Sequence, residues 1–334
     1  MQVDLELLKE IQPNVIKQLQ AIFEHNKVGH AYIFEGAKGS GVTEMMAYFA
    51  QLLLCEQPKE NIPCGTCRSC IRLKSGNHLN FHEVFPEGQF IKIDAIEVLM
   101  AELSKKGVEE GRKIYVVHEA ERLNVKSANK LLKTLEEPDG QVTAIFLTKN
   151  INAIMPTIRS RCQHVKFQPV SRKIIIKELQ EQSISFSIAA TLSVITSNLE
   201  EAIRLSEDEV FAHARKTVLK LIEVVSQNVH ESLLIVHEDW LPAFKEKEQM
   251  ELALDLLLFA IRDIVAIKAN PEAELTYPDM KQSWSSMALR STYDGLSAQL
   301  QAVLKARQQL QSNMNRTLLM EQLMLNLQEG KSFV

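Results

Sequence analysis

A glycine-rich run between an apolar strand pattern and a helical pattern constrains this chain more than any other feature. The run reads GAKGSGVTE from Gly36 to Glu44, it follows the apolar stretch HAYIFEG at 30–36, and helical spacing continues from Thr43 to Leu54. A strand that turns through glycines directly into a helix is typical of a parallel sheet covered by helices. We therefore expect an α/β fold at the start of the chain.

The same run has the outline of a phosphate-binding loop that lacks one part. The residues at the correct spacing for nucleotide contact are Gly36, Gly39, Gly41 and Thr43, whereas Val42 stands where the pattern requires lysine. Valine supplies neither a positive charge nor a hydrogen-bond donor to the phosphates, so we do not expect ATP to be bound. A glycine-rich loop also serves simply as a tight turn, and that alternative stays open.

The second strand pattern, KIYVVHEAE at 113–121, shows a matching loss. A magnesium-dependent nucleotidase of this kind needs a carboxylate at the end of this strand and then a group that orients water. His118 occupies the metal position, and Glu119 follows it. Imidazole is a poor ligand for Mg²⁺, which prefers oxygen, so a second part of the hydrolytic machinery is missing.

Further strand patterns lie at 143–150 and 161–170. The run SANKLLKTLEEP between the second and third strands has helical spacing and is stopped by Pro138. Strands that alternate with helices favour a parallel sheet with helices on its faces. We assign residues 1–170 to this α/β domain.

Beyond the strands, the chain shows only helical patterns. Three short helical patterns occupy 171–208, which is enough for a small helical subdomain, and helical periodicity continues through 209–334. A loop is expected from Ala269 to Ser285, where two prolines and many polar residues interrupt the periodicity.

Charge and hydropathy exclude two classes of protein. A formal net charge of −4 over 334 residues is not that of a strongly basic protein that binds nucleic acid by itself. The most apolar stretch, Leu252 to Ile267, contains three charged residues, so no membrane partner is expected. The N-terminus is acidic and amphipathic rather than a secretory signal, which predicts a cytoplasmic protein.

A cluster of cysteines predicts a metal site. Cys55, Cys64, Cys67 and Cys70 have the spacing C-x8-C-x2-C-x2-C. Four thiolates suit tetrahedral zinc, and a closed set of four cysteines is structural rather than catalytic. The alternative is four reduced thiols without a metal. Cys162 lies far along the chain and is left out of the predicted site.

Four runs resemble bacterial clamp-loader subunits of the AAA+ class. They are GHAYIFEGAKGSG at 29–41, ANKLLKTLEEP at 128–138, IRSRC at 158–162 and NMNRTLLMEQLMLNL at 313–327. The resemblance covers the whole chain. It implies an AAA+ nucleotide-binding-like domain over 1–170 with an inserted zinc module at 55–70, a helical lid over 171–208 and a helical collar over 209–334.

The resemblance also implies partners and a role. Clamp-loader subunits, including gamma/tau and delta, form a hetero-pentameric ring through their collars, and the ring opens the sliding clamp and places it on primed DNA at the replisome. The ring belongs to the DNA polymerase III holoenzyme, a DNA-directed DNA polymerase and thus a nucleotidyltransferase. In this family the arginine of the Ser-Arg-Cys motif, here Arg161, reaches the ATP site of the adjacent subunit.

The chain itself is expected to have no intrinsic catalytic activity. Family members that use ATP carry a lid arginine where Glu200 stands here, which is a third loss. The preferred interpretation is therefore an assembly subunit that donates Arg161 in trans. The alternatives are a weakly active ATPase of the gamma/tau type and a free-standing zinc-dependent DNA-binding protein, which fits poorly with the charge balance.

Overall fold

The computed structural model describes residues 4–104, 111–137, 140–225, 228–312 and 314–329. The chain divides into two compact units, Met1–Ile174 and Ile175–Val334. The first unit is built on a sheet, whereas the described residues of the second form helices and connecting loops without a strand.

Five parallel strands form the sheet of the first unit, in the order β2-β3-β4-β1-β5. Their bounds are β1 Ala31–Glu35, β2 Phe81–Val84, β3 Lys113–Val117, β4 Val142–Thr148 and β5 Gln163–Lys166. The four strand patterns expected from the sequence are confirmed. β2 was not predicted, because the edge strand FHEV has only four residues, two of them polar.

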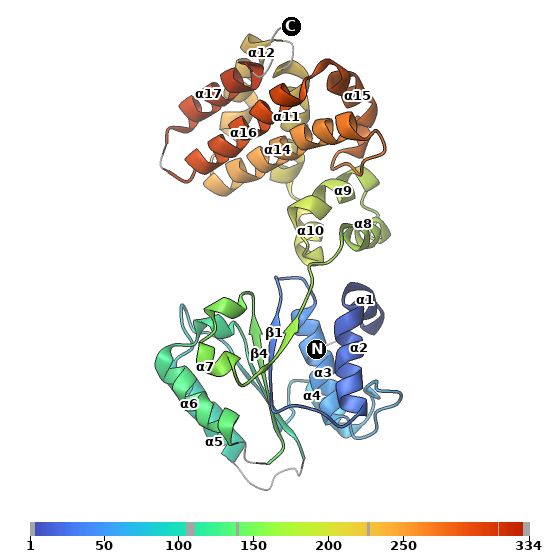
Figure 1. The fold of residues 1–334 in the computed structure, drawn as a ribbon, viewed down its shortest axis with the longest axis vertical. Helices are drawn as coiled ribbons and strands as arrows, with labels where there is room; N and C mark the ends of the chain where they lie inside the picture. The colour runs from blue at the N-terminus through green and yellow to red at the C-terminus, as the bar shows by residue number, and fades with distance from the viewer. Residues whose placement is uncertain (1–3, 105–110, 138–139, 226–227, 313, 330–334) are drawn as a thin grey trace. The chain divides into compact units, whose positions relative to one another are not determined.

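Helices cover both faces of this sheet, which confirms the predicted α/β class (Figure 1). One face carries α1 Leu5–Ile11, α2 Pro13–Glu24, α3 Val42–Leu54 and α4 Arg68–Lys74, and the other carries α5 Ile93–Ser104, α6 Val125–Glu136 and α7 Pro156–Arg159. Two short 3₁₀ turns, η1 Ala120–Arg122 and η2 Ile151–Ala153, follow β3 and β4. The predicted stop at Pro138 lies outside the described residues.

Side chains alternate between the two faces of a strand, and helices cover both faces of this sheet. Strand β1 is therefore apolar on both sides. Ala31 and Ile33 join the core under α5 and α6, whereas Tyr32 and Phe34 join the core under α3. All four side chains are buried. This explains why the pattern HAYIFEG reads as a continuous apolar run and not as an alternating one.

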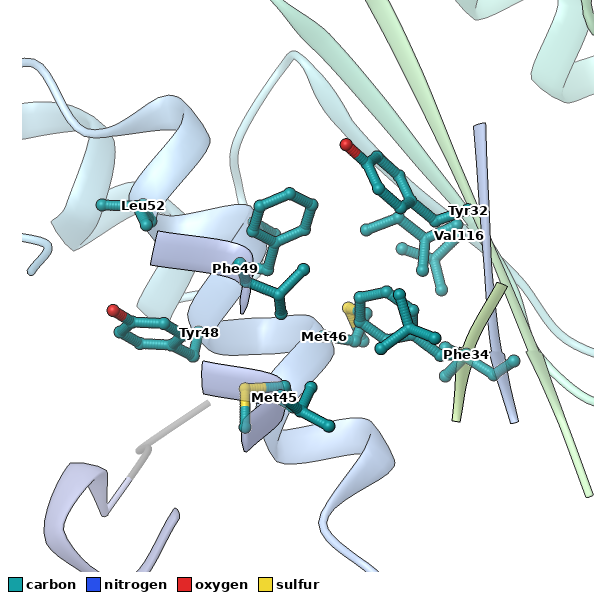
Figure 2. Close-up of a cluster of buried hydrophobic side chains, with 14 of the residues drawn as sticks. Tyr32, Phe34, Met45, Met46, Tyr48, Phe49, Leu52 and Val116 are labelled. Carbon is teal, nitrogen blue, oxygen red and sulfur yellow. The ribbon is translucent and has the colours of Figure 1, made fainter. Parts of the chain in front are cut away.

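The core under α3 is aromatic and well packed. Figure 2 shows Met46 and Phe49 of α3 directed toward Tyr32 and Phe34 of β1 and Val116 of β3. The rings of Tyr32 and Phe49 meet edge to face, with 5.4 Å between their centroids. Such pairs add to the apolar burial that fixes α3 on the sheet, and α3 in turn positions the glycine-rich loop that precedes it.

The second unit contains helices throughout its described residues. They are α8 Arg172–Glu181, which begins in the first unit, α9 Phe186–Ile195, α10 Leu199–Ser206, α11 Glu209–Val225, α12 Val229–Ile235, the π-helical turn η3 Val236–Trp240, α13 Leu241–Ala243, α14 Lys247–Ala269, the 3₁₀ turn η4 Pro278–Met280, α15 Lys281–Arg290, α16 Tyr293–Gln309 and α17 Arg316–Glu329. Among the described helices, none combines the length and apolar character that a membrane span requires.

The predicted loop from Ala269 to Ser285 is wrong at its end, because α15 already begins at Lys281. Trp284 is fully buried, and its ring meets that of Tyr277 with 5.3 Å between centroids. The carboxylate of buried Asp263 accepts the backbone N–H groups of Thr276 (2.6 Å) and Tyr277 (2.8 Å). Tertiary packing therefore orders a segment whose composition is typical of a loop.

Candidate functional site

The glycine-rich loop connects the carboxyl end of β1 to the N-terminus of α3, and its glycines are required by its own geometry. Gly39 and Gly41 have φ of 82°, the left-handed region that favours glycine. A Cβ on Gly36 would lie 2.4 Å from Oγ of Ser40 and 2.6 Å from Cγ2 of Val42. The turn therefore demands glycine whether or not a phosphate is bound.

A buried glutamine fastens this loop to the rest of the unit. The side-chain amide of Gln12, between α1 and α2, donates to the carbonyl oxygens of Ser40 (2.8 Å) and Gln168 (2.6 Å). Its oxygen accepts the backbone N–H of Gln168 at 3.3 Å. Gln12 was not predicted as a site residue, because a single glutamine has no pattern in sequence. Its three bonds join the N-terminal helices, the loop and the segment after β5.

The positions that would hold phosphate and magnesium have other environments here. Val42 is half-buried and packs against the core under α3, whereas Thr43 is exposed in the first turn of the helix. Exposed Glu44 follows directly. A carboxylate in the first helical turn interacts favourably with the helix dipole, but it repels a phosphate at the same place. Exposed Lys38 is the cation within the loop.

His118 follows the carboxyl end of β3, at the same edge of the sheet as the glycine-rich loop. Its Nε2 lies 2.8 Å from Oε1 of Glu83, and its ring stacks on Phe85 with 4.1 Å between centroids. Glu119 pairs with Arg122 at 3.0 Å and has a positive φ of 46°. His118 stands in the place of the magnesium-holding group and Glu119 in that of the water-orienting group. Both side chains thus have partners within the chain.

Glu35, the last residue of β1, joins the turn after β4 and the strand β5 to this edge and was not anticipated from the sequence. It accepts the backbone N–H of Ile151 (3.0 Å), and its other oxygen lies 2.9 Å from Nε2 of His164 on β5. The backbone N–H of Ile151, followed by His164, lowers the pKa of the Glu35 carboxyl. The Glu35 carboxylate therefore connects β1 to β5 and to the turn after β4, at the sheet edge where the glycine-rich loop begins.

Arg161 of the Ser-Arg-Cys motif follows α7 and is about one-third exposed. Its guanidinium pairs with Glu136 of α6 at 2.6 Å and also donates to the carbonyl oxygen of Thr157 at 3.0 Å. Cys162 is turned toward the core under α5 and α6, and burial raises the pKa of its thiol to about 12. The motif therefore presents a charged arginine next to an inert thiol.

The four predicted metal-ligand cysteines converge between α3 and α4. The sulfur atoms of Cys55, Cys64, Cys67 and Cys70 all lie within 4.8 Å of one another. Cys55 ends α3 and Cys67 is the N-cap of α4, while Gly65 supplies the positive φ of 72° that the intervening turn needs. These four thiols could hold one metal ion. Cys162 is not part of the group, as expected.

Backbone amides prepare part of this cluster for a metal. The N–H groups of Thr66 and Cys67 point to the sulfur of Cys64 and lower the pKa of its thiol to about 6. Burial raises the pKa of Cys55 and Cys70. Thiolate is the form that binds metals, so a bound cation would have to offset the burial of these two sulfurs.

Two family models match the chain. The model described as DNA polymerase III, delta subunit, matches residues 11–171, and the model for the C-terminal part of the same delta subunit matches residues 213–329. DNA polymerase III subunit delta′ of Bacillus subtilis is 39% identical over 99% of this chain and 100% of its own length. Subunit delta′ of Escherichia coli is 25% identical over 93% of this chain and 92% of its own length.

A further relative covers only part of the chain. DNA polymerase III subunit tau of Bacillus subtilis is 29% identical over 59% of this chain and 37% of its own length. The parallel sheet with its strand–glycine loop–helix unit defines an α/β protein with a helical second unit, and the two delta-subunit models match these two parts in turn. The chain belongs to the DNA polymerase III delta′ family.

The role of Gln12 in fastening the loop leads to a stability prediction. In a Gln12→Ala variant the carbonyl oxygens of Ser40 and Gln168 lose their donor, which costs about 1–3 kcal/mol when such groups stay buried. Urea denaturation should show a loss of that size in the free energy of unfolding. Gln18→Ala, on the exposed side of α2, is the control and should change it by less than about 0.5 kcal/mol. Equal effects of the two variants would contradict this assignment.

Proposed function

We propose that this chain is a non-hydrolysing subunit of a DNA polymerase III clamp loader, which helps to place the sliding clamp on primed DNA during replication. The observation that carries the proposal is that the AAA+ loop keeps its turn while the charged groups for phosphate and magnesium are replaced. Val42 packs into the core, and His118 pairs with Glu83.

Electrostatics is the reason for expecting no hydrolysis. Phosphoryl transfer depends on cations that neutralise the phosphates and the transition state, and each missing cation weakens that stabilisation. Here the loop offers valine at the lysine position, with the carboxylate of Glu44 beside it. Glu200, in the exposed first turn of α10, would add a further negative charge where the lid arginine of ATP-using relatives is expected.

Arg161 is the group through which the chain would contribute to catalysis, by reaching the ATP site of a neighbouring subunit. Its ion pair with Glu136 is partly exposed, and such pairs are worth only about 0–1 kcal/mol. A guanidinium held this weakly can exchange its carboxylate for a phosphate at little cost. Arginines that act in trans on a transferring phosphoryl group raise rates by about 10³–10⁵-fold.

The partners in this proposal are the gamma/tau and delta subunits in a hetero-pentameric ring. The helices over 209–334, described as far as residue 329, would form the collar that assembles the ring, and 171–208 would be the lid. Within the second unit the lid and collar are joined: Oγ1 of Thr191 donates to the carbonyl oxygen of Thr276 at 2.9 Å and accepts the Nε–H of Arg215 at 3.4 Å. We place this assembly with the replisome in the cytoplasm.

Zinc is the metal proposed for the cysteine cluster. Four thiolates without an open coordination position suit a structural zinc ion. The oxygen of Glu56 accepts the backbone N–H of Ser69 at 3.1 Å, which links the start of the module to α4. The zinc would hold the inserted segment at 55–70 in place and would take no part in chemistry.

The alternative is a weakly active ATPase subunit of the gamma/tau type. An ATPase assay of the isolated chain with Mg²⁺ separates the two functions. We expect no turnover above background, because neither the loop lysine nor the metal-holding carboxylate is present. Brisk hydrolysis by the purified chain, abolished by Thr43→Ala, would instead support the alternative.

Arg161→Ala tests the contribution in trans. Ring assembly with the partner subunits should be intact, while hydrolysis at the adjacent ATP site should fall by about 10³-fold or more. The first readout is the DNA-stimulated ATPase rate of the assembled complex, which should fall by the contribution of the one ATP site that Arg161 reaches. The second readout is the rate of clamp loading. Arg159→Ala is the matched control, since this exposed arginine two residues earlier contacts Asn152. Normal ATPase in an intact Arg161→Ala ring would refute the role.

Zinc binding is tested by elemental analysis. The purified chain should carry one zinc ion per molecule, and a Cys67→Ser variant should lose it together with thermal stability, because metal-binding energy is folding energy. Cys162→Ser should retain the full zinc content, since its sulfur lies outside the cluster. A Cys67→Ser protein that keeps its zinc would show that the ligands are other groups.

A further inference from the structure

The guanidinium of Arg161 is held by three acceptors that differ in kind. One of its terminal nitrogens donates to the carbonyl oxygen of Thr157 at 3.0 Å and to Oγ of Ser160 at 3.2 Å, and the other donates to Oε1 of Glu136 at 2.6 Å. Thr157 and Ser160 belong to the same turn of the chain as the arginine. Glu136 lies 25 residues earlier, at the end of α6, and is the charged member of the set.

The backbone on both sides of Arg161 is anchored. Ile158 is fully buried, and Cys162 packs against the core under α5 and α6. The hydroxyl of Ser160 donates its own proton to the carbonyl oxygen of Thr157 at 3.1 Å, so its lone pairs accept from the guanidinium. The turn and its two neutral acceptors thus orient the guanidinium without neutralising its charge.

The position of the Glu136 carboxylate is unfavourable for its own helix. Glu136 is the last residue of α6, where the helix dipole presents its negative end. A carboxylate at that end is destabilising unless a cation lies beside it, and Arg161 supplies the cation. The stability of α6 therefore does not account for this carboxylate, whereas its contact with the arginine does.

We propose that Glu136 restrains Arg161, and that the phosphates of the neighbouring ATP compete with this carboxylate for the guanidinium. The inference rests on the role in trans proposed above. On ring assembly the triphosphate, which carries more negative charge, displaces the carboxylate, while Thr157 and Ser160 keep the guanidinium oriented. The side chains of Arg161 and Glu136 are 36% and 51% exposed, and such a pair shifts an equilibrium by at most about fivefold. The carboxylate thus lowers activity at the neighbouring site by a small factor.

Glutamine at position 136 separates the charge of this contact from its geometry. Its side chain has nearly the same size as that of glutamate, and its carbonyl oxygen can still accept from the guanidinium, but it carries no charge. In Glu136→Gln the guanidinium therefore keeps its orientation and loses its anionic competitor. Glu137→Gln is the matched control, since it removes the same charge from an exposed residue outside the three acceptors.

The experiment measures the DNA-stimulated ATPase of the full complex, assembled from this chain, the gamma/tau and delta subunits and the sliding clamp. For each variant, the share that depends on Arg161 is the rate of the complex minus the rate of the same complex with Arg161→Ala added. Glu136→Gln should raise the kcat of this share about two- to fivefold, with the thermal unfolding temperature of the chain unchanged. The increase should shrink at high ionic strength, because salt screens the ion pair that the variant lacks. Glu137→Gln should leave the share unchanged.

The outcomes separate this inference from the proposed role of Arg161. If Arg161→Ala leaves the ATPase of an intact complex unchanged, the role in trans fails and the restraint fails with it. If Arg161→Ala lowers the rate but Glu136→Gln leaves the Arg161-dependent share unchanged or reduces it, the role in trans stands and the restraint is overturned. An equal increase in Glu137→Gln, or an equal increase by Glu136→Gln in the Arg161→Ala background, would be a general effect of surface charge and would also overturn the restraint.

Discussion

The first unit depends on the position of β1 inside its sheet. β1 is hydrogen-bonded to β4 on one side and β5 on the other, so its backbone groups are satisfied, and its side chains enter both cores. The loop at its carboxyl end is confined by contact: a Cβ on Gly36 would collide with Ser40, and Gln12 holds the Ser40 carbonyl from outside. The interior strand β1 and these contacts thus constrain the loop at its carboxyl end.

This constraint explains how the glycine-rich turn can be kept without the charged groups of a phosphate-binding loop. The glycines are needed for the turn itself, since Gly39 and Gly41 have left-handed φ values and Gly41 also lies against Ile11. A lysine at position 42 and a carboxylate at position 118 are needed only for phosphate and magnesium. Their replacement by valine and histidine leaves the turn intact, because Val42 adds to the core and His118 finds Glu83 and Phe85.

The cysteine cluster and Arg161, the two groups to which we assign proposed roles, differ in how firmly the chain holds them. The cysteine sulfurs converge because helix ends and a glycine turn position them, and backbone N–H groups stabilise the thiolate of Cys64. Arg161, in contrast, is held by a partly exposed ion pair with Glu136 and by exposed hydrogen bonds to the Thr157 carbonyl and the Ser160 hydroxyl. A rigid cluster suits a structural metal, whereas a weakly held guanidinium suits a group that has to reach another molecule.

The sequence alone determined the α/β class, four of the five strands, the helical second half and the cysteine spacing, because local periodicity and short-range spacing carry that information. It also determined which charges are absent from the loop. Only the tertiary structure decided the roles of Gln12 and Glu35, since their partners are distant in sequence. It likewise decided the edge strand β2 and the start of α15, where burial beside a neighbouring strand or helix outweighs weak local preference.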